Sequence, residues 1–267
     1  MRVRVLSAVL MGRAPTTRNG LTIALVCLAI SCLAHPAFSQ DTTSTGSRAQ
    51  VAGAISITNK GISTVPSFTL GKPAATVDVS IRKGNLGFEP QFNFGLNGKP
   101  WTSLFWLRYR LPEGDKLHLT VGAHLAIAFA TLPVSVSGAS RDVIVARRYL
   151  AGELSPSYSL SKNVLVGAYY LYSHGFEQGV TKNIHFLAPR VSFTHVKLTR
   201  EYFMRVNPQV YYLKTDRRDG FYLYSGLTLA KSNSPLSISA IVNRTIQTSV
   251  LASEDLLWNV SLNYSIK

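Results

Sequence analysis

Residues 258–266 read WNVSLNYSI, and this stretch has the clearest side-chain pattern of the chain. Large apolar or aromatic side chains alternate here with small polar ones, without a break. The large ones are Trp258, Val260, Leu262, Tyr264 and Ile266. A period of two places successive side chains on opposite faces of a β-strand, whereas an amphipathic helix repeats every three to four residues. The stretch therefore predicts a strand with one face in an apolar medium and the other face against polar groups.

The same alternation recurs through the rest of the chain, and no segment of useful length has a helical period. Turn sequences such as Lys83-Gly84-Asn85 and Asn233-Ser234-Pro235 separate the alternating segments. Twelve strands are predicted, over residues 49–58, 73–83, 86–95, 101–111, 116–129, 143–160, 163–174, 182–198, 203–213, 220–231, 235–244 and 255–266. The chain is therefore expected to be all-β.

Strand length and the pattern of connections distinguish two all-β architectures. Several predicted strands have ten or more residues, whereas strands of soluble proteins average about five or six. Short turns alternate with longer connections, at 59–72, 130–142, 174–181 and 245–254. This layout is typical of a closed antiparallel transmembrane β-barrel, here of about 12 strands, with both chain ends on the side of the short turns. A β-sandwich of the cell surface is the alternative.

The first 39 residues have the composition of an export signal. Four arginines and no acid precede the apolar run LTIALVCLAISCLA at 21–34, and small residues at Ala37 and Ser39 fit cleavage before Gln40. A transmembrane anchor would require about 18 apolar residues, and Cys32 offers a weaker lipidation alternative. The predicted organisation is a cleaved signal peptide at 1–39, a flexible periplasmic lead-in at 40–48 and an outer-membrane barrel at 49–267.

Composition excludes several classes of site. Both cysteines, Cys27 and Cys32, fall within the predicted signal, so the mature chain has no disulfide, thiolate metal site or cysteine nucleophile. It carries 24 basic against 13 acidic residues. The basic residues are spread along the chain and form no tract, and therefore nucleic acid is not expected as a partner. The sequence predicts no cofactor and no metal site.

Aromatic residues and prolines give finer expectations. Trp101 and Tyr109 fall at the two ends of one strand face, and Trp258 and Tyr264 do so on the last strand, as in interfacial aromatic girdles. Pro189 lies in the middle of a predicted strand, where it removes a hydrogen-bond donor. A register-shifting bulge is expected there.

The chain resembles small Gram-negative outer-membrane β-barrels of an uncharacterised porin-like class, over residues 49–267. The resemblance rests on the signal and on LSPSYSL at 154–160 turning through 161–163, together with the terminal strand 258–266. FEPQFNFG at 88–95, GKPW at 98–101 and RYRL at 108–111 are also similar. It implies localisation in the bacterial outer membrane, contact with outer-membrane lipid, and recognition of the C-terminal strand by the barrel-assembly machinery. Such strands usually end on an aromatic residue, whereas Tyr264 here lies three residues before the end.

Function is expected to come from the polar strand faces. The charged side chains predicted to line the lumen are Arg82, Glu89, Arg108, Arg110, Arg147, Glu153 and Arg205. Polar residues predicted on the same faces are Asp78, Gln91, Asn93, His118, His124, Asn207 and Gln209. Asp78, Glu89 and Glu153 are too few to neutralise the arginines. Two interpretations stay open: charges that pair and fill a closed barrel, and a water-filled path that attracts anions.

Three functions are weighed on this basis. The favoured hypothesis is a narrow channel or binding pore for small, anionic solutes, with no catalytic residue. The first alternative is a structural or surface-binding barrel that acts through its extracellular loops. The second is a lipid-modifying outer-membrane enzyme, such as a lipid hydrolase or deacylase. It would use His195 near Ser192 and Thr194, with His185 and His174 on the same hairpin.

Overall fold

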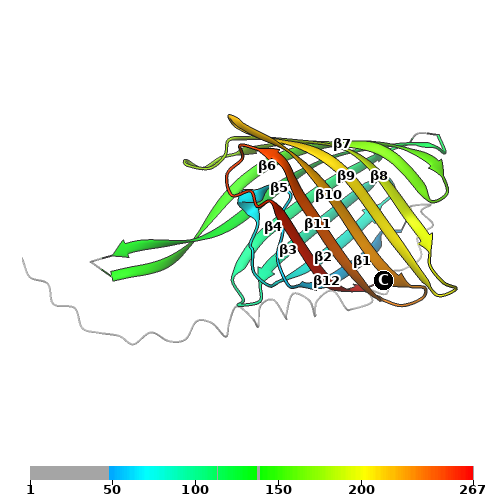
Figure 1. Cartoon of the computed structure of the whole chain (residues 1–267), viewed down its shortest axis with the longest axis horizontal. Helices are drawn as coiled ribbons and strands as arrows, with labels where there is room; N and C mark the ends of the chain where they lie inside the picture. Colours follow the sequence, from blue (N-terminus) through cyan, green and yellow to red (C-terminus); the bar gives the residue numbers. More distant parts are fainter. Residues whose placement is uncertain (1–47, 113, 137–138, 267) are drawn as a thin grey trace, which may run out of the picture. The chain divides into compact units, whose positions relative to one another are not determined.

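The computed structural model describes residues 48–112, 114–136 and 139–266. Twelve antiparallel strands follow one another in chain order, and β1 pairs with β12 to close the barrel (Figure 1). Their bounds are β1 Gln50–Thr58, β2 Ala74–Lys83, β3 Leu86–Gly95, β4 Pro100–Leu111, β5 Leu117–Val136, β6 Ala139–Ser161, β7 Val164–Gly175, β8 Asn183–Lys197, β9 Tyr202–Thr215, β10 Arg218–Lys231, β11 Leu236–Thr248 and β12 Leu256–Ile266. The predicted closed antiparallel barrel of about 12 strands is confirmed. The predicted signal peptide lies outside the described residues.

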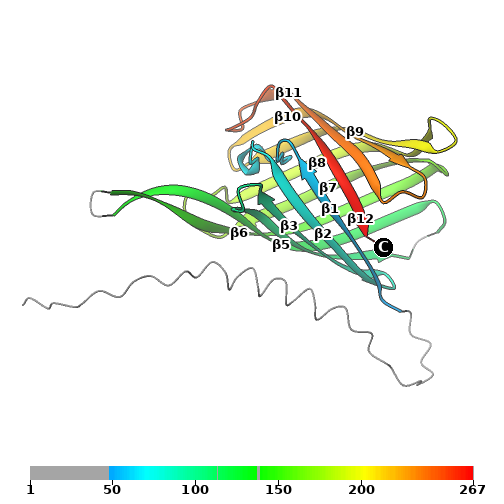
Figure 2. The same cartoon turned by 90° about the horizontal axis from the view of Figure 1, so that it is seen from below.

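The stretch 258–266 lies in β12, whose register with β1 runs from Gly53↔Ile266 to Thr58↔Ser261. This pairing leaves neither terminal strand with an open edge, as closure requires. It also sets the start of β1 and the end of β12 at the same end of the barrel (Figure 2). We call this the short-turn end, since the turns at 84–85, 112–116, 162–163, 198–201 and 232–235 lie there too. The other end is the long-loop end.

The outer wall of the barrel is apolar. Along β12, the side chains of Trp258, Val260, Leu262 and Tyr264 are about half exposed, whereas Asn259 is buried. The same holds around the barrel, where Leu107, Leu223 and many other large apolar residues are exposed. A closed barrel satisfies all its backbone hydrogen bonds internally, and an apolar exterior suits only a bilayer. The architecture is that of an outer-membrane barrel, and the sandwich alternative is wrong.

The described residues contain one short helix, η1 (Pro66–Phe68), and none long and apolar enough to cross a bilayer.

The predicted loop 130–142 is wrong. β5 and β6 have 20 and 23 residues and pair as far as Val136↔Ala139, so they form a long hairpin that projects beyond the barrel (Figure 1). β4 pairs with β5 only as far as Ala128, and β7 reaches β6 only at Tyr149. The outer part is therefore a two-stranded ribbon. Pro133 is tolerated in it because no third strand requires its missing backbone donor.

The predicted bulge at Pro189 is also wrong. The β7–β8 register runs through Ala168↔Pro189 without a shift, and the irregularity between β8 and β9 lies further on, between Phe193 and Val196. Pro189 is not paired with a residue of β9. Its missing backbone donor therefore interrupts the β8–β9 hydrogen-bond ladder at this position but does not shift the register. Side chains from Pro189 to Phe193 therefore keep the facing that simple alternation gives them.

The orientation in the membrane is a testable expectation. With the short-turn end in the periplasm, an epitope tag after Ala252, in the β11–β12 loop, should bind its antibody on intact cells. A tag at Gly114, in the β4–β5 turn, should bind only after permeabilisation. Gly138, the second position expected outside, is not among the described residues. Labelling of Gly114 alone on intact cells would reverse the orientation.

Candidate functional site: the lumen

Four charged side chains on the inner wall form one ion-pair cluster. Arg108 on β4 contacts Glu89 on β3 (Nη1–Oε2 2.6 Å) and Glu153 on β6 (Nε–Oε1 2.5 Å). Arg82 on β2 contacts Glu89 from its other side (Nη2–Oε1 2.5 Å). Two guanidinium groups therefore balance two carboxylates, three of them on the consecutive strands β2, β3 and β4 and the fourth, Glu153, 45 residues from Arg108 along the chain.

The cluster depends on a small residue between its members. Gly122 on β5 is paired with both Arg108 and Glu153. A Cβ at Gly122 would lie 2.8 Å from Glu153 Oε1 and 3.1 Å from Arg108 Cγ. The glycine therefore leaves the space in which the two side chains meet. Glu153 is deeply placed, with 2% of its side chain exposed, and it also accepts a hydrogen bond from the Tyr169 hydroxyl (2.7 Å).

The remaining arginines of the lumen have no carboxylate within ion-pair distance among the described residues. Arg110 lines the hollow around the ion-pair cluster, Arg147 lies at the long-loop end beside Phe68, and Arg205 lines a separate hollow at the short-turn end. The structure therefore brings together five of the predicted lumen residues, Arg82, Glu89, Arg108, Arg110 and Glu153. It places Arg147 and Arg205 apart from them.

Sequence reasoning missed Arg190 on β8. Its guanidinium lies beside the cluster, where Nη2 donates to Ser155 Oγ (2.6 Å) and the Cζ atom lies 5.5 Å from the centre of the Tyr169 ring. Alternation alone places Arg190 on the same face as Ile184 and Phe186. The bulge expected at Pro189 obscured this signal.

Trp106 was missed as well, and it marks a boundary in the lumen. The Cζ atom of Arg108 lies 3.9 Å from the centre of the indole, and the His124 ring lies 3.8 Å away, centre to centre. His124 is buried, and its Nδ1 atom has no hydrogen-bond partner among the described residues. On the short-turn side of Trp106 the wall is charged, whereas on the long-loop side it is mainly aromatic and apolar, with Arg147 near the end.

The aromatic part of the wall forms a ladder across four strands. Tyr169 meets Phe186 edge to face (ring centres 5.9 Å apart), Phe186 stacks on Tyr211 (4.8 Å), and Tyr211 stacks on Tyr222 (4.7 Å). Tyr211 and Tyr222 are almost completely buried. Side chains of this size inside a barrel narrow its lumen.

The β1–β2 loop at 59–73, which contains the predicted connection 59–72, folds into the long-loop end of the lumen. Tyr211 donates its hydroxyl hydrogen to the Thr64 carbonyl (3.3 Å), Phe68 packs edge to face on Tyr149 (4.9 Å), and Val65 is buried. Three backbone hydrogen bonds, from Gly61 to Lys72 and from Leu70 and Gly71 to Gly61, join the two ends of the loop. The loop is thus a compact excursion that narrows the lumen further.

The girdle position predicted for Trp101 is wrong. A bulge between Asn93 and Phe94 shifts the register with β4 by one residue. Trp101 instead contacts the inserted loop, because its Nε1 donates to the Phe68 carbonyl at 2.7 Å. The bulge thus re-aims one large side chain from the lipid to the loop.

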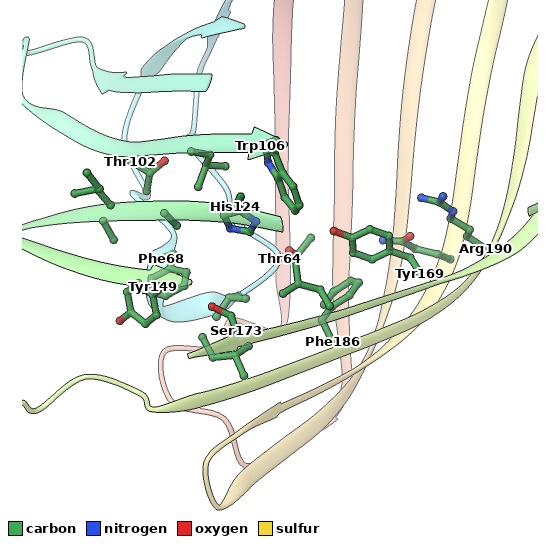
Figure 3. A pocket seen from close by; sticks show the side chains of 18 residues that line it. Thr64, Phe68, Thr102, Trp106, His124, Tyr149, Tyr169, Ser173, Phe186 and Arg190 are labelled. Atoms are coloured by element: carbon green, nitrogen blue, oxygen red, sulfur yellow. The ribbon is translucent and has the colours of Figure 1, made fainter. Parts of the chain in front are cut away.

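A cavity of about 340 Å³ lies between the inserted loop and the charged cluster (Figure 3). Phe68 and Tyr149 are at one end of it, Arg190 and Tyr169 are at the other, and Phe186 lies between them. Most of the lining is apolar or aromatic, including Leu104, Ala126, Leu171 and Ile184.

The histidines proposed for an enzyme are held in other contacts. His185 shares a hydrogen bond with the Tyr170 hydroxyl (2.9 Å), His174 lies 3.4 Å from the Asn183 side-chain oxygen, and His195 stacks on Phe203. No Ser–His–carboxylate chain of hydrogen bonds links them in the part of the chain that the structure describes. Within the same residues, no group of three potential ligands could hold a metal ion.

No family model matches this chain, and no curated protein matches it significantly. Similar solved structures are known. A KdgM porin in complex with disordered oligogalacturonate is 10% identical, covers 82% of this chain and 100% of its own, and has a TM-score of 0.49. A NanC porin is 13% identical (80% and 99% covered, TM-score 0.48), and LpxR from Salmonella typhimurium is 11% identical (80% and 99%, 0.44). Because these similarities are distant, the function has to be inferred from the residues that line the lumen.

Proposed function

We propose that the chain forms a narrow pore of the bacterial outer membrane that admits and binds small anionic solutes. The observation that carries the proposal is the charge imbalance of the inner wall. Among the described residues, the ion-pair cluster is internally balanced, whereas Arg110, Arg147, Arg190 and Arg205 have no carboxylate partner.

Unbalanced charge in a lumen acts on the solution around it. Low-dielectric walls concentrate the field of fixed charges along a water-filled path, and the local concentration of counter-ions rises. An unpaired guanidinium in a narrow space is costly unless water or an anion reaches it. Four such groups, spaced from the long-loop end to the short-turn end, provide successive stations for an anion.

Export and assembly belong to the same proposal. Residues 1–39 act as the signal peptide, and the barrel-assembly machinery recognises β12. The outer face of β12 is accessible, because the side chains of Trp258 and Tyr264 on this face are about half exposed. The pore needs no cofactor.

Ion selectivity tests the proposal. Arg110→Glu combined with Arg205→Glu should leave the barrel folded, because neither side chain belongs to the ion-pair cluster and both are exposed. The double variant should shift the reversal potential of planar bilayers under a KCl gradient from anion toward cation preference, since the field of the lumen changes sign at both positions.

The control changes the same net charge on the outer surface. Lys214 is exposed, and Arg244 is paired with Leu223 and Leu256, whose side chains are exposed on the apolar wall. Lys214→Glu with Arg244→Glu should leave selectivity as in the parent protein. Equal selectivity in all three proteins, or no conductance in any of them, would contradict an anion path.

A second candidate function follows from the β5–β6 hairpin. Its outer part exposes Leu132, Val134, Val143 and Ile144 on a two-stranded ribbon whose edges are unpaired. Unpaired strand edges and apolar side chains are features of surfaces that bind other proteins. A barrel that acts through this hairpin would keep its binding when the lumen is altered.

A further inference from the structure

The cavity described above does not suit a hydrophilic ion. Its wall is formed by groups such as Phe68, Leu104, Tyr149 and Phe186, which offer few partners to water or to a bare anion. Apolar cavities of this kind stay dry or hold apolar molecules. A pore for small hydrophilic anions alone would not require such a wall, and a purely filled barrel would not leave the space.

Among the described residues, one charged group, Arg190, borders this apolar space. Arg190 lines both the cavity and the hollow around the ion-pair cluster, and its one side-chain hydrogen bond within the described part of the chain goes to the neutral Ser155. The Arg190 guanidinium has five N–H donors, and these are therefore not all bound to protein acceptors. A planar carboxylate matches the geometry of these donors. Gln209, the β9 partner of Arg190, also lines the cavity and adds a neutral amide.

A polar atom without a partner lies in the same wall. His124 is 8% exposed and lines the cavity, and its Nδ1 atom has no hydrogen-bond partner among the described residues. Buried polar atoms normally have partners, and exceptions call for an explanation. Among the described residues, an apolar chamber, a guanidinium without a carboxylate partner at one end and one unpartnered ring nitrogen in the wall together match the general form of a small-molecule site.

We infer that this cavity is a binding site for an amphiphilic organic anion, whose ring system fills the apolar chamber and whose carboxylate lies on Arg190. The inference rests on the proposed function only for the route of entry, and it narrows the solute class to aromatic or alicyclic carboxylates. Size agrees: an engineered cavity of about 150 Å³ holds one benzene ring, and this cavity of about 340 Å³ has room for two fused rings with a carboxylate.

Equilibrium binding to the mature protein in lipid nanodiscs tests the inference, with empty nanodiscs subtracted. The probe is sodium naphthalene-2-carboxylate, measured by titration calorimetry beside its neutral carboxamide and beside galacturonate, a hydrophilic carboxylate. The naphthalene carboxylate should bind more tightly than either comparator, because only it uses both the chamber and the guanidinium.

Variants separate the two halves of the site. Arg190→Gln should weaken binding of the naphthalene carboxylate by about tenfold or more, since a charge-assisted hydrogen bond is lost, and should leave the carboxamide unaffected. Arg190→Lys should restore part of the loss. Ala126→Leu, which fills the chamber, should weaken both naphthalene ligands. Arg244→Gln, an arginine on the outer surface, should change neither.

Three results would overturn the inference. The first is absence of naphthalene carboxylate binding, and the second is galacturonate binding as tightly as the naphthalene carboxylate. The third is a naphthalene carboxylate affinity that Arg190→Gln and Ala126→Leu leave unchanged. Bilayer selectivity is read separately, with Arg110 and Arg205. Anion preference without naphthalene carboxylate binding would therefore reject this site and retain the pore, whereas binding without conductance would reject the pore and retain the site.

Discussion

Arg108→Met is expected to destabilise the barrel more than any other single substitution in the lumen, by about 3 kcal/mol. The substitution removes the guanidinium cation that contacts both Glu89 and Glu153. Glu153, with 2% of its side chain exposed, would keep among the described residues only the hydrogen bond from Tyr169, and a buried carboxylate without a cation is costly. Urea unfolding in phospholipid vesicles, followed by tryptophan fluorescence, measures the free-energy change.

Arg110→Met is the matched control, since Arg110 lies two residues further along β4, faces the same lumen and is exposed. It should leave the free energy of unfolding nearly unchanged. Adding Glu153→Gln to Arg108→Met should recover much of the lost stability, because the buried carboxylate that has lost its cation is then neutral, whereas Glu89 keeps its contact with Arg82. Equal effects of the Arg108 and Arg110 substitutions would mean that the ion-pair cluster does not stabilise the barrel.

Replacing residues 62–69 by two glycines is expected to raise the single-channel conductance several-fold. The segment holds Thr64, Val65 and Phe68, which occupy the long-loop end of the lumen. Its flanks should stay in place, because Gly61 is hydrogen-bonded across the excursion to Leu70, Gly71 and Lys72. With the insertion gone, the aromatic ladder would face a wider, water-filled mouth.

Planar-bilayer recordings of the shortened and parent proteins make the comparison. The control removes residues 132–143 and joins Thr131 to Ile144, which already pair across the β5–β6 hairpin. That deletion lies outside the lumen and should leave conductance as in the parent. If removing 62–69 changes conductance no more than the hairpin deletion does, the inserted loop does not control the pore. Loss of a surface partner on hairpin deletion, with conductance intact, would support the hairpin as a separate binding element.

The charged residues of the lumen show which features of a site can be predicted from a single sequence. Alternation along β4 is enough to place Arg108 and Arg110 on one face, because the facing of side chains in a strand is a local property. The partners of those arginines cannot be predicted from this local pattern. Glu153 lies 45 residues from Arg108 along the chain, and the register across β5, with Gly122 between them, brings the two together.

Two errors have a common cause. The expected bulge at Pro189 hid Arg190, and the real bulge beside Phe94 turned Trp101 toward the β1–β2 loop. Whether a strand accommodates a missing donor or an extra residue depends on the strand next to it, since a bulge is a property of a pair. The sequence of one strand therefore does not predict whether a bulge forms at a given position.

The sequence predicts about twelve strands, a barrel in preference to a sandwich, and the apolar outer wall, because a period of two is specified residue by residue along each strand. The contents of the lumen depend on contacts between distant segments. The loop 59–73 folds inward because Thr64 meets Tyr211, 147 residues away, and Phe68 meets Tyr149. Those contacts exist only once the barrel has closed, and they convert a polar interior into a charged half and an apolar chamber.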